Sequence, residues 1–200
     1  MVLLTSKECN FDLEATDFNL PGVDGRNWSL QQCMGRNGLL IMFICNHCPY
    51  VKAVQECIVR DALELKQLGI ESVAILSNDT TNYPEDSFYN MRLLAERLKF
   101  SFPYLLDESQ AVAKNYNAVC TPDFFGYNKD YKLQYRGRLD ASRKETAPED
   151  SKRELFEAMK LIGETNHGPQ YQVPSSKFQV PSSKYRMFHK MEVKQHPDKI

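Results

Sequence analysis

Two cysteines separated by two residues, Cys45 and Cys48, have the types and spacing best suited to chemistry in this chain. They follow the apolar run 38–44 and precede a segment with helical spacing, so a buried strand is predicted to deliver them to a helix N-terminus. The unpaired N–H groups there favour a thiolate over a thiol. Because a thiolate attacks disulfides, the pattern predicts thiol–disulfide exchange with Cys45 as the nucleophile and Cys48 as the resolving thiol.

His47 immediately precedes Cys48 and is the third candidate for the site. We expect an imidazolium or ring N–H close to Cys45 to stabilise its thiolate, which would lower the pKa of that thiol and stabilise the reduced form. The alternative is an exposed histidine in the first turn with no effect on the cysteines.

A metal site is the main alternative explanation of the two cysteines, besides a pair of inert core thiols. Structural zinc takes four ligands, usually from a second Cys/His pair at matching spacing, and the sequence has no such pair. The spacing therefore favours redox chemistry with no metal and no cofactor. A copper(I) carrier using Cys45, His47 and Cys48 stays open, since soft thiolates suit copper(I).

The other cysteines carry weaker signals. Cys120 lies two residues before Pro122 and is either a third redox thiol, a transient partner of Cys48, or a small buried hydrophobic residue. Cys57 is out of phase with Cys48 on a helix and is not expected to share the site. Cys9 and Cys33 have no local partner and are interpreted as structural.

Length and charge restrict the class of protein. The 200 residues fit one domain with appendages, and the net charge of −1 gives no indication of nucleic acid or an anionic membrane as partner. No apolar run reaches the ~18 residues of a membrane span. The first eight residues lack a basic region followed by a long apolar core, which predicts a cytoplasmic protein. In that reducing compartment the six cysteines are not expected to form a disulfide scaffold.

Strands that alternate with helices must position the cysteines. Segments 11–13 and 18–20, with turn signals at 21–22 and 24–25, predict an N-terminal hairpin. Further strands are expected at 39–44, 72–76, 102–106, 123–127 and 132–138, and helices at 29–33, 49–68, 84–98, 109–116 and 148–162. This order predicts an α/β fold with a mixed sheet over residues 1–163.

Residues 164–200 differ in character from the rest. Gln172–Phe178 is followed at once by the near-identical heptapeptide Gln179–Tyr185. From His167 onward six Lys/Arg face two acidic residues, so the segment is weakly basic. We expect a flexible polar tail that is dispensable for folding.

These features resemble the thioredoxin superfamily, and within it the AhpC/TSA (redoxin) and TlpA/ResA-like branch. The resemblance covers about residues 11–162 and depends on the Cys45–Cys48 unit, on Thr121-Pro122 and on the segment 106–113; residues 45–53 resemble a subgroup with this motif. It implies a thioredoxin-like fold, a mixed central sheet flanked by helices with an N-terminal hairpin extension. It also implies that Pro122 is cis beside Cys45 and leaves the Thr121 backbone free to pair with a substrate.

The chain departs from those families at several positions. Met42 and Gly38 stand where peroxiredoxins carry Thr and Pro before the peroxidatic cysteine. Leu39 and Val51 replace the acidic residues of thioredoxin and of ResA-like proteins, so no carboxylate is expected as proton acceptor for Cys48. The remaining charged candidates are interpreted as solvated charges or caps: Asp86, Asp107, Glu108, Arg136 and Arg138.

The sequence therefore predicts a thiol:disulfide oxidoreductase with a Cys45–Cys48 dithiol, a protein or small-molecule disulfide as substrate and an upstream reductant. A peroxiredoxin-like antioxidant is the first alternative and metal or copper(I) binding the second. The sequence gives no indication of the oligomeric state.

Overall fold

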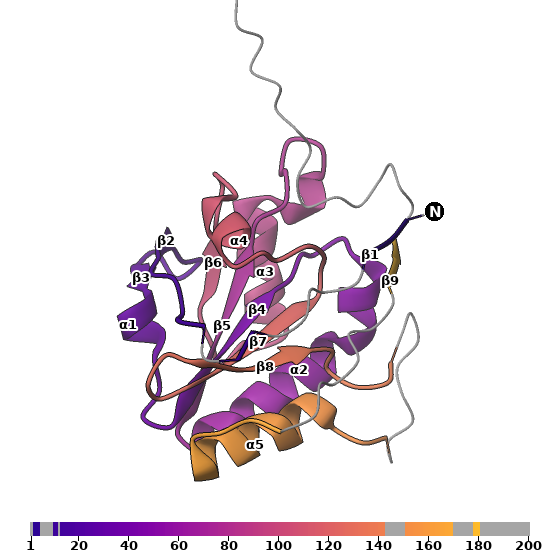
Figure 1. The fold of residues 1–200 in the computed structure, drawn as a ribbon. Helices are drawn as coiled ribbons and strands as arrows, with labels where there is room; N and C mark the ends of the chain where they lie inside the picture. Colours follow the sequence, from indigo (N-terminus) through magenta and orange to yellow (C-terminus); the bar gives the residue numbers. More distant parts are fainter. Residues whose placement is uncertain (1, 5–9, 12, 143–150, 170–177, 181–200) are drawn as a thin grey trace, which may run out of the picture.

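The computed structural model describes residues 2–4, 10–11, 13–142, 151–169 and 178–180, and its centre is a five-stranded mixed sheet (Figure 1). The strands lie in the order β6-β5-β4-β7-β8. Neighbours β4, β5 and β6 are parallel, whereas β7 is antiparallel to both β4 and β8. Their bounds are Gly38–Phe43 (β4), Ile70–Leu76 (β5), Tyr104–Leu106 (β6), Asp123–Asn128 (β7) and Leu133–Gly137 (β8).

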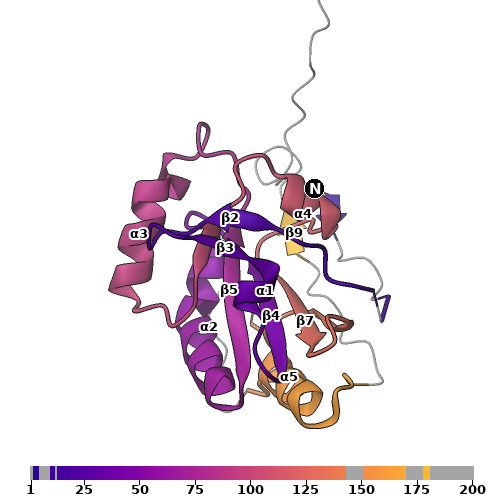
Figure 2. The ribbon, with the colours of Figure 1, turned by 90° about the vertical axis from the view of Figure 1, so that its left-hand side faces the viewer.

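Helices cover both faces of this sheet. One face packs against α2 (Pro49–Gln67), α3 (Phe88–Arg97) and α5 (Glu154–Thr165). The other packs against α1 (Leu30–Cys33), α4 (Ala111–Asn115) and the residues around the hairpin of β2 (Asn19–Pro21) and β3 (Asn27–Ser29), which Figure 2 shows in front of the sheet. The predicted α/β fold with an N-terminal hairpin is confirmed.

The central strand β4 is apolar at every position because both of its faces are covered. Leu40 and Met42 belong to the core under α2, while Ile41 and Phe43 belong to the opposite core. Alternate side chains of a strand point to opposite faces, so this strand anchors both layers and ends directly before Ile44 and Cys45.

Helix α2 begins at Pro49, with Cys48 as its N-cap residue. Proline is tolerated at the first helical position, where its missing N–H would have had no intrahelical partner. A stripe of buried residues then faces the sheet: Val51, Val54, Ile58, Ala62 and Leu65. The helix is thereby held rigidly behind the two cysteines.

The helix predicted at 148–162 begins only at Glu154, the strand predicted at 102–106 begins at Tyr104, and two other elements differ more. The hairpin lies at residues 19–29 instead of 11–20, because the turn signals separate its strands and Asp24 accepts hydrogen bonds within the turn, for example from the Arg26 backbone N–H. The predicted helix 84–98 is divided into a 3₁₀ turn, η1 (Pro84–Asp86), and α3. Ser87 divides them because it adopts an extended conformation and its side chain caps α3 through Asn90 N–H.

The C-terminal region is described only in part. Helix α5 continues past the predicted boundary at Gly163 and is capped by Asn166 in a left-handed conformation. Further on, β9 (Phe178–Val180) pairs antiparallel with β1 (Val2–Leu4). The rest of the duplicated heptapeptides lies outside the described residues, so flexibility of this segment stays a prediction. Within the described part of the chain, no helix is both long and apolar enough to cross a membrane.

Candidate active site

The two cysteines lie together at the carboxyl end of β4 and the start of α2. Cys45 follows the strand closely and is 1% exposed, and Cys48, the N-cap of the helix, is 4% exposed. Both are free thiols. The structure therefore brings the predicted pair to the predicted place, though neither sulfur is freely accessible.

Thr121 contacts both cysteines from the loop before β7. Its hydroxyl Oγ1 lies 3.2 Å from Cys45 Sγ, and its carbonyl oxygen lies 3.3 Å from Cys48 Sγ, which donates. The Thr121-Pro122 peptide bond is cis, as the resemblance implied. The loop thus places one polar group against each sulfur of the dithiol.

The two thiols differ in acidity in the direction opposite to the sequence-based expectation. Burial raises the pKa of Cys45, and the nearby charges of Cys48 and Asp86 raise it further. A hydrogen bond from Cys45, together with the N–H groups of Val51 and Tyr50, lowers the pKa of Cys48 to about 6 against the opposing effect of burial. The reason is local: Cys48, and not Cys45, occupies the N-cap position, where the first N–H groups of α2 have no intrahelical partner.

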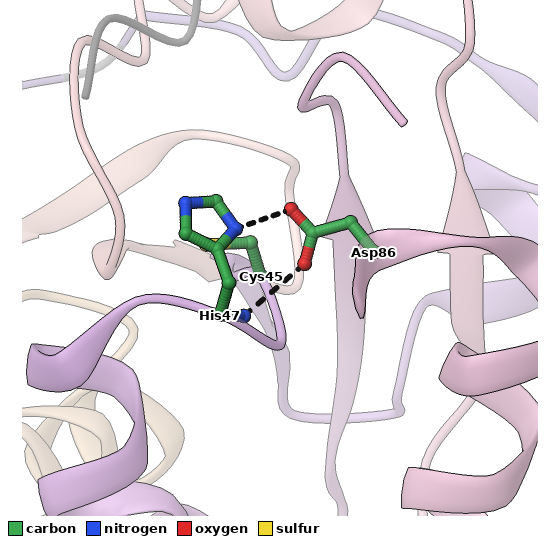
Figure 3. Close-up of side chains that lie close together, drawn as sticks. All are labelled: Cys45, His47 and Asp86. Carbon is green, nitrogen blue, oxygen red and sulfur yellow. Dashed lines mark hydrogen bonds and ion pairs between the residues drawn. The ribbon is translucent and has the colours of Figure 1, made fainter. Parts of the chain in front are cut away.

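The His47 side chain pairs with the carboxylate of Asp86. Its Nδ1 lies 2.6 Å from Asp86 Oδ2, as Figure 3 shows, and Asp86 Oδ1 accepts the backbone N–H groups of Asn46 and His47 at 2.8 and 3.2 Å. The Tyr83 ring stacks on the imidazole with centroids 4.2 Å apart. The imidazole is therefore fixed between a carboxylate and an aromatic ring.

Asp86 was interpreted as a solvated charge or a cap; it is fully buried, so it is not a solvated charge, and it accepts backbone N–H groups of the loop before α2. It lies in η1, after the loop that follows β5. Since β5 is parallel to β4 and adjacent to it, the loops after both strands meet at one edge of the sheet. The sequence could therefore indicate that the loop after β5 lies near the cysteines. It does not indicate which polar residue of this loop turns inward.

The remaining candidate residues from the sequence form no hydrogen bond with Cys45 or Cys48 within the part of the chain that the structure describes. Cys120 is buried, its Sγ lies 3.9 Å from Pro122 O, and burial raises its pKa, with the charge of Asp123 adding to this. Its role as a third redox thiol stays a prediction. Asp107, also buried, accepts hydrogen bonds from Ser77 Oγ and from Ala113 N–H in α4, which agrees with a structural, cap-like role. Arg136 is buried rather than solvated.

Three potential ligands for a cation occur at this site. One ligand atom each of Cys45, His47 and Asp86 lies within 4.8 Å of the others, a different set from the predicted Cys45, His47 and Cys48. Thiolate, imidazole and carboxylate together suit zinc. Both oxygens of Asp86 already accept hydrogen bonds from this loop, however, so the geometry favours a hydrogen-bonded Asp–His pair over a preformed metal site.

The mixed sheet, with a Cys-x-x-Cys at the start of α2 and a cis-proline beside it, defines a thioredoxin-like protein. The sequence model of the AhpC/TSA family matches residues 12–139, and the chain therefore belongs to that family, which supports a redox function. A search of the curated proteins found no match.

Solved structures share this fold. An uncharacterized conserved protein from Geobacillus kaustophilus is 42% identical with a TM-score of 0.82, over 88% of this chain and 93% of that one. A hypothetical protein from Sinorhizobium meliloti 1021 is 33% identical with a TM-score of 0.80, over 86% and 93% of the two chains. A peroxidoxin from Mycobacterium tuberculosis, 18% identical over 63% of this chain and 83% of that one with a TM-score of 0.52, shares the fold.

Proposed function

We propose that this protein is a thiol–disulfide oxidoreductase in which Cys45 and Cys48 alternate between a dithiol and a disulfide. The observation that carries the proposal is the contact of both sulfurs with Thr121 at 3.2 and 3.3 Å, combined with the lowered pKa of Cys48. At neutral pH such a pair holds one thiolate and one thiol, which are the two species that a disulfide exchange requires.

The reaction transfers two electrons to a substrate disulfide. A thiolate of the pair attacks one substrate sulfur, and the substrate S–S bond breaks. The other substrate sulfur leaves as a thiolate, and the attacked sulfur stays joined to the protein cysteine in a mixed disulfide. The second cysteine attacks the protein sulfur of that mixed disulfide and gives its proton to the departing substrate sulfur, which leaves as a thiol. The product is the Cys45–Cys48 disulfide, and an upstream dithiol reductant returns it to the starting state. A thiol-reducing, cytoplasmic setting is part of this proposal.

Reduction of a model protein disulfide such as that of insulin tests the proposal. We expect the Cys45→Ala and Cys48→Ala variants to lose at least about 100-fold in turnover, because each lacks one of the two sulfurs that must attack in succession. Cys57→Ala is the matched control: this cysteine lies on α2, away from the dithiol, and is half-buried, and its replacement should leave the rate unchanged. Full activity of either active-site variant would refute a dithiol mechanism.

Hydroperoxide reduction is the second candidate, and membership of the AhpC/TSA family is the observation that favours it. Against it, burial raises the pKa of Cys45, and Met42 stands where the peroxiredoxin threonine would lie. Single-turnover consumption of hydrogen peroxide by the reduced protein separates the two. We expect oxidation by peroxide to be slower than oxidation by a disulfide at equal concentration.

A further inference from the structure

The buried carboxylate of Asp86 contacts two backbone N–H groups and one ring nitrogen of the active-site loop. Oδ1 accepts the backbone N–H groups of Asn46 and His47, and Oδ2 lies 2.6 Å from His47 Nδ1. Both residues lie between the two cysteines, so these donors belong to the loop that surrounds the dithiol. Asp86 itself is fully buried and comes from a different element, η1.

The His47 ring lies within reach of both Asp86 and Cys45. One ligand atom each of Cys45, His47 and Asp86 lies within 4.8 Å of the others, so a sulfur anion on Cys45 would be a second acceptor within reach of the His47 ring (Figure 3). A carboxylate is a strong acceptor of such bonds. While Asp86 holds the His47 ring, the ring cannot turn toward the sulfur.

Neighbouring contacts fix this arrangement. The Tyr83 ring stacks on the imidazole at an interplanar angle of 4°. Asn46 donates its side-chain amide to Glu85 O at 2.8 Å and accepts the Tyr104 hydroxyl at 3.0 Å. The loop between the cysteines is thus tied to η1 and to β6, and rotation of His47 toward Cys45 would break the contact with Asp86 and the stacking on Tyr83.

We propose that Asp86 is a positioning residue of the dithiol: it holds the His47 ring away from Cys45, so that the pair is poised as a reductant rather than an oxidant. This inference rests on the proposed function. Donors and cations near a thiolate stabilise the reduced form and make a dithiol more oxidising. Asp86 removes this ring donor and adds a negative charge, and both effects favour the disulfide product over the dithiol.

The reduction potential tests this role directly. The protein is equilibrated with reduced and oxidised glutathione, in the presence of a chelator, and the dithiol fraction is measured. Dithiol and oxidised glutathione give the protein disulfide and two reduced glutathione molecules, so no other reactant is needed. We expect Asp86→Asn to shift the equilibrium at least tenfold toward the dithiol, about 30 mV for this two-electron couple.

Two further variants separate positioning from packing. Asp107→Asn is the matched control, because Asp107 is equally buried and accepts a backbone N–H, from Ala113, but contacts another part of the sheet edge. It should leave the potential unchanged. In the double variant Asp86→Asn/His47→Ala, the shift should be smaller than in Asp86→Asn alone, because the released imidazole is absent and only the loss of the Asp86 charge remains; an equal shift would contradict the positioning role.

A potential that is unchanged or lower in Asp86→Asn would overturn the inference. If that variant does not fold, nitrogen NMR of His47 in the unaltered reduced protein decides: a proton on Nδ1 is expected, and a ring carrying its proton only on Nε2 overturns the inference. Failure of the proposed function gives a different result, since the unaltered protein would then form no Cys45–Cys48 disulfide in any glutathione buffer.

Discussion

Cys45 Sγ and Thr121 Oγ1 lie 3.2 Å apart although 76 positions separate the two residues in the chain. The strand β4 supplies the first and the loop before β7 supplies the second, and these two strands are antiparallel neighbours. Cys45 follows the end of β4, and Thr121 precedes the start of β7, so the pairing of the strands alone brings them to the same edge. The thiol site is therefore a consequence of strand order.

Removal of the Thr121 hydroxyl should weaken catalysis without unfolding the protein. In Thr121→Val the contact with Cys45 is lost, while the backbone carbonyl that contacts Cys48 is kept. A hydrogen bond worth about 0.5–1.5 kcal/mol corresponds to a 2- to 10-fold lower kcat/KM for disulfide reduction. Thr121→Ser retains the hydroxyl and should restore the rate, and equal losses in both variants would contradict this role.

The reduced dithiol should ionise close to pH 6. The pKa of Cys48 is about 6 because Cys45 donates to it and the helix N–H groups face it. Alkylation by iodoacetamide should therefore accelerate as the pH rises through 6 and level off above it, with the label on Cys48. In Cys45→Ala the midpoint should move upward, because the largest stabilising contact is absent. A label found first on Cys45 would instead support the sequence-based assignment of the nucleophile.

The same ionisation should make the stability of the reduced protein depend on pH. The folded pKa of Cys48, about 6, lies below the ordinary value of 9.0, so the stabilisation is complete above pH 9 and is lost as the pH falls through 6. Urea unfolding of the reduced protein at pH 5 and pH 8 measures this. The unfolding free energy of the unaltered protein should rise from pH 5 to pH 8 by more than that of Cys48→Ala does. Equal rises in the two proteins would contradict the low pKa.

A buried ion pair between two strands should be essential for stability. Arg136 on β8 pairs with Asp123 on β7 at 3.2 Å, with side chains only 6% and 1% exposed, and also donates to Asn117 O. Asp123→Ala leaves a buried charge without this partner and should cost about 3–5 kcal/mol of unfolding free energy. Glu157→Ala removes an exposed pair with Lys152 and should cost no more than about 1 kcal/mol. Similar urea midpoints for the two variants would refute the expectation.

Two truncations test where the folded domain ends. Asn166 O accepts from Asn128 Nδ2 at 2.9 Å, and Gly168 N–H donates to Gln134 Oε1 at 3.0 Å. A chain that ends after Pro169 keeps these contacts and should retain its melting temperature within a few degrees. A chain that ends after Gly163 loses them and the last turn of α5, and should melt at a lower temperature. A large loss in the longer chain would show that the segment beyond Pro169 contributes to the fold.

The sequence by itself determined the framework that carries the thiols. The unbroken apolar run of β4 required a strand covered on both faces, and the stripe from Val51 to Leu65 required a helix packed on one side. Both are local patterns, so they could be read without any knowledge of distant contacts. The two cysteines lie at the junction of these elements, and their proximity followed from the same local reading.

The division of charge within the site was decided only by the tertiary structure. The sequence indicated neither that Cys48 rather than Cys45 faces the first N–H groups of α2, nor that Asp86 turns inward to bind His47. A polar residue in a loop can be solvated or buried, and which one occurs depends on contacts made across the sheet edge. Hydrogen-bond geometry and burial control acidity, and both arise only when β4, β5 and β7 are assembled side by side.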